Sequence, residues 1–158
     1  RGRITFGFPR QVSGNRKNVQ AYESYTGKGW LLGKWCPADK VEWVVSGTDG
    51  NARLKKVLFE GTPAQCKNPQ NYFDYQIVVR NGTYRIRARV GDLYLPSWQK
   101  IEFEGVASVT KSLNAGETDW TGERVVKVND GTLNVRMYID SENKRVAGLS
   151  EIVFQRAY

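Results

Sequence analysis

The sequence predicts an all-β fold, an antiparallel β-sandwich of the jelly-roll type. No segment of the 158-residue chain carries a convincing helical stripe of apolar side chains. Many short stretches instead alternate apolar and polar residues, and turn-forming residues such as Gly, Asn and Asp separate them. A series of short strands joined by turns is typical of sandwiches and jelly rolls. The chain length and a hydrophobic content of 40% fit a single domain over residues 1–158.

The clearest strand follows the turn dipeptide Asn81-Gly82, whose two residues both tolerate a positive φ. Side chains alternate over residues 83–90, which predicts a core strand with one buried and one solvent-facing side. Residues 72–79 are rich in β-forming residues and lead into the same dipeptide, so we expect the two strands to pair as a hairpin. The expected buried side chains are Tyr84, Ile86, Ala88 and Val90, and the expected outward ones are Thr83, Arg85, Arg87 and Arg89.

Shorter strands are expected on both sides of this segment. Asp130-Gly131 is a second hairpin signal, and it predicts that residues 123–128 pair with residues 133–139. Ile101 and Phe103 resume the alternation after a loop that follows Gly91-Asp92. The remaining expected strands are residues 3–8, 40–45, 54–59, 106–109 and 149–154.

The chain carries a net charge of +8. A basic surface favours anionic partners such as acidic glycans, nucleic acid or acidic proteins, or it serves only solubility. No apolar run approaches the roughly 20 residues needed to cross a bilayer, so we expect no membrane insertion. The chain begins at Arg1 without a charged and then apolar leader. We therefore expect a mature form, or a piece cut from a longer chain.

The two cysteines, Cys36 and Cys66, fit no four-ligand zinc pattern, and there is no histidine. We therefore expect no metal site and no cofactor. The cysteines form either a disulfide, worth roughly 3–4 kcal/mol and indicating an oxidising compartment, or two unrelated buried thiols. Asn81-Gly82-Thr83 is also an N-glycosylation sequon, which serves either as a glycan acceptor or only as a turn.

Catalysis is not expected. Without histidine, neither a Ser-His-Asp triad nor a Cys-His pair can form. Glu102 and Glu104 would lie on one face of a strand about 6.5–7 Å apart, near the separation of an inverting glycosidase pair. However, they would lie on an open sheet face, where nothing would raise one of their pKa values. The sequence therefore favours a binding protein over an enzyme.

Seven segments, in this order, match a known family over the length of the chain. They are RITFGF, AYESYTGKGW, TDGNARLKKVLFEG, VVRNGTYRIRARVGD, KIEFEGV, VVKVNDGTLNV and GLSEIVF. With them the chain resembles the malectin-like, galactose-binding-like carbohydrate-binding modules. The resemblance implies a jelly-roll sandwich that binds a glycan without catalysis, at loops along one rim, usually within a larger extracellular or cell-surface protein.

The candidate sugar site combines aromatic rings with an acid. Rings can stack on the C–H face of a pyranose, and nearby carboxylates can accept its hydroxyl protons. Asp92, Tyr94 and Trp98 offer this combination within seven residues. Alternatively, the rings plug the end of the sandwich and Asp92 caps the strand end. A second group of rings that could reach the same rim is Tyr22, Tyr25 and Trp30.

The arginines at positions 85, 87 and 89 suggest an anion site. Guanidinium groups suit the planar oxygens of carboxylate or sulfate. Alternatively, outward Lys100, Glu102 and Glu104 on a neighbouring strand neutralise the arginines. Nucleic acid is less favoured, because the outward positions of residues 83–89 carry no ring.

The expected function is therefore non-catalytic binding of an oligo- or polysaccharide, neutral or acidic, by an extracellular or secreted domain. The alternative is a structural module that holds protein subunits together in a cell-surface or filament assembly.

Overall fold

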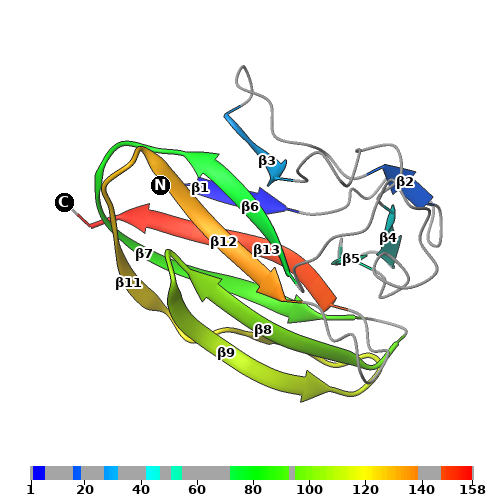
Figure 1. The fold of residues 1–158 in the computed structure, drawn as a ribbon. Helices are drawn as coiled ribbons and strands as arrows, with labels where there is room; N and C mark the ends of the chain where they lie inside the picture. The colour runs from blue at the N-terminus through cyan, green and yellow to red at the C-terminus, as the bar shows by residue number, and fades with distance from the viewer. Residues whose placement is uncertain are drawn as a thin grey trace.

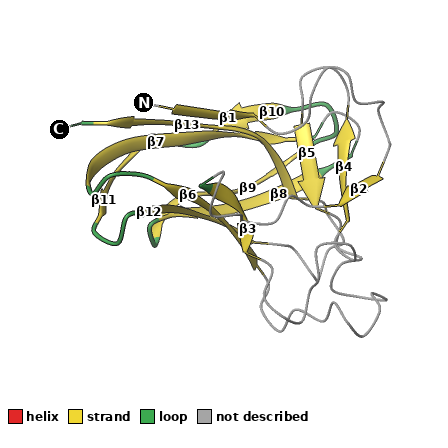
Figure 2. Cartoon of the chain, turned by 90° about the horizontal axis from the view of Figure 1, so that it is seen from above, coloured by secondary structure: helices red, strands yellow, loops and turns green. Residues whose placement is uncertain are grey.

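The computed structural model describes residues 2–5, 16–18, 27–31, 42–46, 51–54, 72–92, 95–138 and 147–157. These residues form two antiparallel sheets that face each other as a sandwich (Figures 1 and 2). The predicted all-β jelly-roll class is confirmed. None of the described residues forms a helix that could cross a membrane.

Sheet A has the strand order β10-β7-β13-β5-β4-β2, with β11 also paired to β7 and β1 to β13. Sheet B has the order β3-β6-β12-β8-β9. The strands of sheet A are β1 (Gly2–Thr5), β2 (Arg16–Asn18), β4 (Glu42–Ser46), β5 (Asn51–Leu54), β7 (Gly82–Gly91), β10 (Thr118–Trp120), β11 (Arg124–Val128) and β13 (Ala147–Arg156). Those of sheet B are β3 (Lys28–Leu31), β6 (Tyr72–Val78), β8 (Ser97–Phe103), β9 (Val106–Leu113) and β12 (Thr132–Tyr138).

The core lies between the sheets and follows from the alternation in the sequence. The predicted inward side chains of β7 are all buried. Sheet B contributes the facing side chains from β6, β8 and β12, because every second residue of a strand points to the same side. The largest fully buried apolar side chains are Phe73, Phe103, Ile86, Ile101, Leu133, Met137, Leu149 and Ile152.

Three short strands, β2, β3 and β10, lie in segments where no strand is expected from the sequence. The expected strands differ from the observed ones mainly at their ends. β8 begins at Ser97, before the expected residue 101, and β9 continues to Leu113. β4 covers residues 42–46 instead of 40–45. β5 covers residues 51–54, and the expected residues 55–59 lie outside the described part of the chain, as do residues 6–8.

Both predicted hairpins are wrong. β6 pairs with β3 and β12, whereas β7 pairs with β13, β10 and β11. The Asn81-Gly82 connection therefore crosses from one sheet to the other. A tight two-residue type I′ turn needs a positive φ at both central residues, and here Gly82 has one while Asn81 does not. The Asp130-Gly131 connection likewise leads from β11 in sheet A to β12 in sheet B.

A tight hairpin occurs instead at Glu104-Gly105, between β8 and β9. Both residues have positive φ, 49° and 77°. This turn is not predictable from its residues, because Glu is not among those that commonly adopt a positive φ.

The two crossing connections contact each other at one end of the sandwich (Figure 1). The Gly131 amide donates to Asn81 Oδ1 at 2.7 Å, and the Val79 amide donates to the Gly131 carbonyl at 3.0 Å. Arg156 Nη2 also donates to the Asn81 carbonyl at 3.0 Å. The Asn-Gly and Asp-Gly connections are therefore hydrogen-bonded to each other where the chain passes between the two sheets.

We expect Asn81→Ala to lower the free energy of unfolding by about 1 kcal/mol, because the Gly131 amide loses its acceptor. Asn81→Asp keeps an oxygen at this position and should lose less. Both changes abolish the sequon, so glycosylation does not distinguish the two variants. Urea denaturation of the two proteins checks this, and equal destabilisation would contradict a role for the Asn81 oxygen.

Candidate functional site

Asp92 lies at the end of β7 and is fully buried. Its Oδ2 accepts a hydrogen bond from the Leu95 amide at 2.9 Å, and its carbonyl accepts one from the Gly116 amide at 2.9 Å. The carboxylate thus caps the strand end and fastens the following loop, which is the alternative left open by the sequence. Its participation in a sugar site stays a prediction.

Trp98, the second residue of β8, occupies an outward position of sheet B and is half-buried. Its pairing partner on β9 is Ser112, which is exposed. None of the hydrogen bonds or ring contacts of the described residues involves its indole. Part of the Trp98 side chain is therefore open to solvent, and its place in a sugar site stays a prediction.

The other predicted sugar-site rings are not brought together with Trp98 within the described structure. Trp30 lies in β3 at the register position opposite Tyr75, so β6 and β12 separate its strand from β8. Tyr22, Tyr25 and Tyr94 lie outside the described residues, as do Cys36 and Cys66.

The outward arginines of β7 are placed as predicted, on the outer face of sheet A. Their predicted neutralisation by Lys100, Glu102 and Glu104 is wrong, because those residues belong to sheet B on the other side of the sandwich. Arg87 instead lies over the Trp120 ring at 4.2 Å, and Arg89 donates to Thr118 Oγ1 at 3.2 Å.

The outer face of sheet B carries a network of half-buried charged and phenolic side chains, which we call the sheet B ladder. Its members alternate with core residues along β6, β12 and β8, so the strand register sets them side by side. They are Tyr72 and Asp74 on β6, Arg136 and Tyr138 on β12, and Lys100 and Glu102 on β8.

Hydrogen bonds join the three strands across this ladder. Arg136 donates to both oxygens of Asp74, at 2.8 and 3.0 Å, in a bidentate pair. On the other side, the Tyr138 hydroxyl donates to Glu102 Oε1 at 3.2 Å. The network therefore holds its polar groups in fixed positions before any ligand arrives.

Cations also cover the two phenol rings. The Tyr72 and Tyr138 rings are 5.5 Å apart and inclined at 58°. The Arg136 guanidinium lies 3.8 Å from the Tyr72 ring centre, and Lys100 Nζ lies 4.4 Å from that of Tyr138. These rings are therefore engaged within the ladder, in contrast to Trp98, which lies two residues before Lys100 on the same face.

Two expectations for Glu104 are wrong: it lies in the turn after β8 and not on the strand face of Glu102, and burial does raise the pKa of its carboxyl. The hydrogen bonds that Arg136 donates to Asp74 raise the pKa of its guanidinium, which stays charged. Burial raises the pKa of the Glu104 carboxyl, although the Asn134 amide donates to Glu104 Oε1 at 2.7 Å and opposes the shift. Because Glu104 lies in the turn and Glu102 bonds Tyr138, the two carboxylates have separate structural partners. The described residues contain no group of three or more potential metal ligands.

Tyr72, Asp74, Arg136 and Tyr138 are not among the site residues expected from the sequence. A usable signal was present, because residues 72–76 and 134–138 both place polar or charged side chains at alternate positions of apolar strands. Their complementarity becomes evident only when the strands are known to be neighbours.

Known structures share the two-sheet arrangement. The chain is similar to the Bacillus subtilis protein YXIM, with 18% sequence identity and a TM-score of 0.59 over 98% of this chain. The two share a fold. This chain spans 39% of the length of YXIM, so the likeness concerns the fold alone.

Two proteins with family 35 carbohydrate-binding modules are more distantly similar. A Clostridium thermocellum module has 10% identity and a TM-score of 0.43, covering 91% of this chain and all of the module. The Podospora anserina β-(1,4)-mannanase that carries such a module has 14% identity and a TM-score of 0.43, covering 99% of this chain and 28% of the enzyme. These similarities are too weak to carry an argument. No protein-family model and no curated protein matches the chain.

Proposed function

We propose that this protein binds carbohydrate without catalysis, and that Trp98 and the sheet B ladder form the binding surface. The observation that carries the proposal is the partly exposed indole of Trp98, for which the described residues show no hydrogen bond and no ring contact. It lies on the same sheet face as Lys100, Glu102 and Tyr138. An open ring beside fixed donors and acceptors suits a sugar, which has an apolar C–H face and a rim of hydroxyls.

Each group has a distinct role in this proposal. Trp98 stacks on a pyranose ring, and its indole N–H donates to an oxygen of the sugar. Lys100 is about 6.5–7 Å along β8 from Trp98, close enough for its ammonium to donate to a hydroxyl of the same or the next sugar. Glu102 accepts hydroxyl protons, and its bond to Tyr138 fixes its orientation. The ladder is fixed in place, so little entropy is lost when the ligand binds.

The proposal extends to the context of the domain. We propose one domain of the malectin-like, galactose-binding-like type, extracellular or secreted, as its sequence resemblance suggests. Rings outside the described residues, Tyr22, Tyr25 and Tyr94, would then extend the ligand site at the rim. Asn81 is exposed, and its side-chain oxygen accepts a hydrogen bond from the Gly131 amide. Its use as a glycan acceptor remains a prediction.

An array of neutral oligosaccharides, followed by calorimetry with the best ligand, tests this function. We expect Trp98→Ala to weaken binding at least about tenfold, a loss of roughly 1.4 kcal/mol or more, because the stacking surface is removed. The matched control is Trp120→Ala, which removes a half-buried tryptophan from the other sheet and should leave binding unchanged. Full binding by folded Trp98→Ala, or no binding to any glycan by the unchanged protein, would overturn the proposal.

A further inference from the structure

The outer face of sheet A is strongly basic along its central strand. β7 lies between β13 on one side and β10 and β11 on the other, and its outward arginines therefore lie inside the sheet and not at an edge. Their direct neighbours are mostly neutral: Arg85 lies between Gln155 and Val125, and Arg87 lies opposite Val153. The register places Lys127 on the same face, opposite Thr83.

Acids balance these charges only in part. Within strands β1, β7, β10, β11 and β13, Glu151 is the one acidic residue at an outward position; it lies opposite Arg89 and forms an ion pair with Arg3 on β1. The Arg85 side chain has no hydrogen bond or ion pair with a described residue, and the Arg87 side chain has only its contact with the Trp120 ring. Like charges on alternate residues of one strand repel one another.

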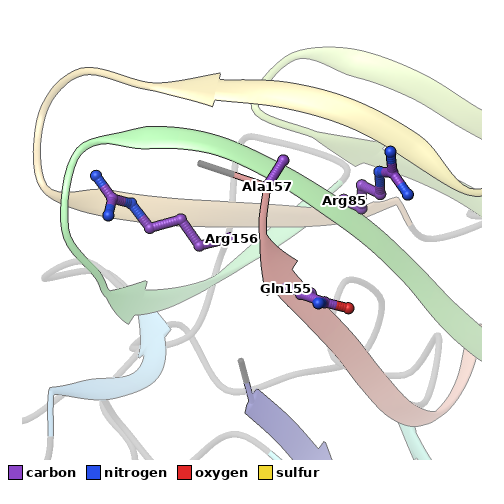
Figure 3. A pocket seen from close by; sticks show the side chains of 4 residues that line it. All are labelled: Arg85, Gln155, Arg156 and Ala157. Carbon is purple, nitrogen blue, oxygen red and sulfur yellow. The ribbon is translucent and has the colours of Figure 1, made fainter.

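A hollow of about 250 Å³ opens where this face meets the C-terminal end of β13. It is lined by Arg85, Gln155, Arg156 and Ala157. Figure 3 shows Arg85 and Arg156 on opposite flanks of Ala157, with their guanidinium groups apart from each other. Gln155 lies directly opposite Arg85 in the sheet and adds a neutral donor and acceptor.

From this arrangement we propose that the outer face of sheet A binds an acidic polysaccharide, a sugar chain that carries carboxylate or sulfate groups. The separated guanidinium groups suit several anionic groups along a polymer better than they suit one small anion. Arg85 holds an anionic group on the outer face. Arg156, whose Nη2 also donates to the Asn81 carbonyl, holds another at the strand end across the hollow. Gln155 bonds a hydroxyl of the sugar between them, and Arg87 continues the contact along β7.

The same face is less suited to single-stranded nucleic acid. Proteins that hold single strands combine basic residues with open aromatic rings on which bases stack. The outward positions of β7 carry no ring, and Arg87 already covers Trp120. This surface lies on the opposite side of the sandwich from Trp98 and the sheet B ladder, so the two can be tested separately.

The test compares Arg85→Gln/Arg87→Gln with a control that also removes two charges, Lys28→Gln/Lys111→Gln on the edge strands of sheet B. The probes are polygalacturonate, dextran sulfate, neutral dextran and single-stranded oligothymidylate, each at low and high salt. We expect the arginine variant to bind at least one acidic polysaccharide at least about tenfold more weakly, and the control to bind it like the unchanged protein. The two acidic probes distinguish carboxylate from sulfate recognition.

Three results would overturn the proposal. These are unchanged binding by the folded arginine variant, equal weakening by the control, which would indicate charge alone, and tighter binding of oligothymidylate than of either acidic polysaccharide. Binding of the best neutral oligosaccharide should be the same in the arginine variant and the unchanged protein. Binding of the neutral oligosaccharide reports on sheet B, and binding of the acidic polysaccharide reports on sheet A. A negative result at one face therefore leaves the proposal for the other face open to its own test.

Discussion

Gly148→Ala will destabilise the protein by about 3 kcal/mol or prevent folding, because the site has no room for a methyl group. Gly148 is buried in β13, and a Cβ at this position would overlap the Gly91 carbonyl oxygen and lie 2.5 Å from the carbonyl carbon. Gly91 is itself closely surrounded, with φ at 121° and the backbone of Glu117 and Thr118 against it. Neither backbone can move away without breaking the pairing of β7 with β13 or β10.

Gly122→Ala is the matched control for this prediction. Gly122 is exposed, and the close atoms around an added Cβ all belong to the guanidinium end of the Arg124 side chain and not to backbone. We expect this change to cost less than about 1 kcal/mol. Urea denaturation of both variants gives the comparison, and a Gly148→Ala protein as stable as Gly122→Ala would mean that β7 and β13 do not approach so closely.

Asp74→Ala will cost about 2 kcal/mol of stability and will also weaken binding of the neutral glycan. The change leaves the Arg136 guanidinium without its bidentate partner at a position where its side chain is only 32% exposed. Removing one partner of a fully buried ion pair would cost more, but here contact with solvent screens the Arg136 charge. Without Asp74, Arg136 is also free to leave the Tyr72 ring, which loosens the face on which the sugar is proposed to lie.

The double variant Asp74→Ala/Arg136→Met separates charge from packing. Methionine fills similar space without a charge, so the double variant should regain part of the stability lost by Asp74→Ala. Thermal and urea denaturation of the single and double variants measure this recovery. A double variant less stable than Asp74→Ala would show that the unpaired guanidinium is not the source of the loss.

Which residues are buried could be predicted from the sequence, because alternation within one strand is a local property. Tyr84, Ile86, Ala88 and Val90 are buried as predicted, and the outward arginines lie on the other face. Which sheet a strand joins is not a local property, because it depends on strands far away in the sequence. Asn81-Gly82 is compatible both with a hairpin and with a crossing between sheets, and the sandwich requires the crossing because the apolar faces of β6 and β7 must face each other.

The same distinction between local and long-range information explains which site residues could be predicted from the sequence. Trp98 and the outward arginines could be singled out because each stands out within its own strand. The sheet B ladder could not be found in this way, because Asp74 and Arg136 are 62 residues apart and form a pair only through the pairing of β6 with β12. Asp92 shows a related ambiguity, since an acid after a strand serves equally well as a cap or as a ligand, and the structure shows the cap.

The central claim is that a neutral sugar lies against Trp98 and the sheet B ladder. An NMR titration of the isotope-labelled protein with the best neutral oligosaccharide from the array tests it most directly. The account predicts that the Trp98 indole N–H and the amides of β8 and β12 near Lys100 and Tyr138 shift most, with β7 and β13 little affected. Shifts centred on the arginine face of sheet A, with the Trp98 signal unmoved, would contradict it.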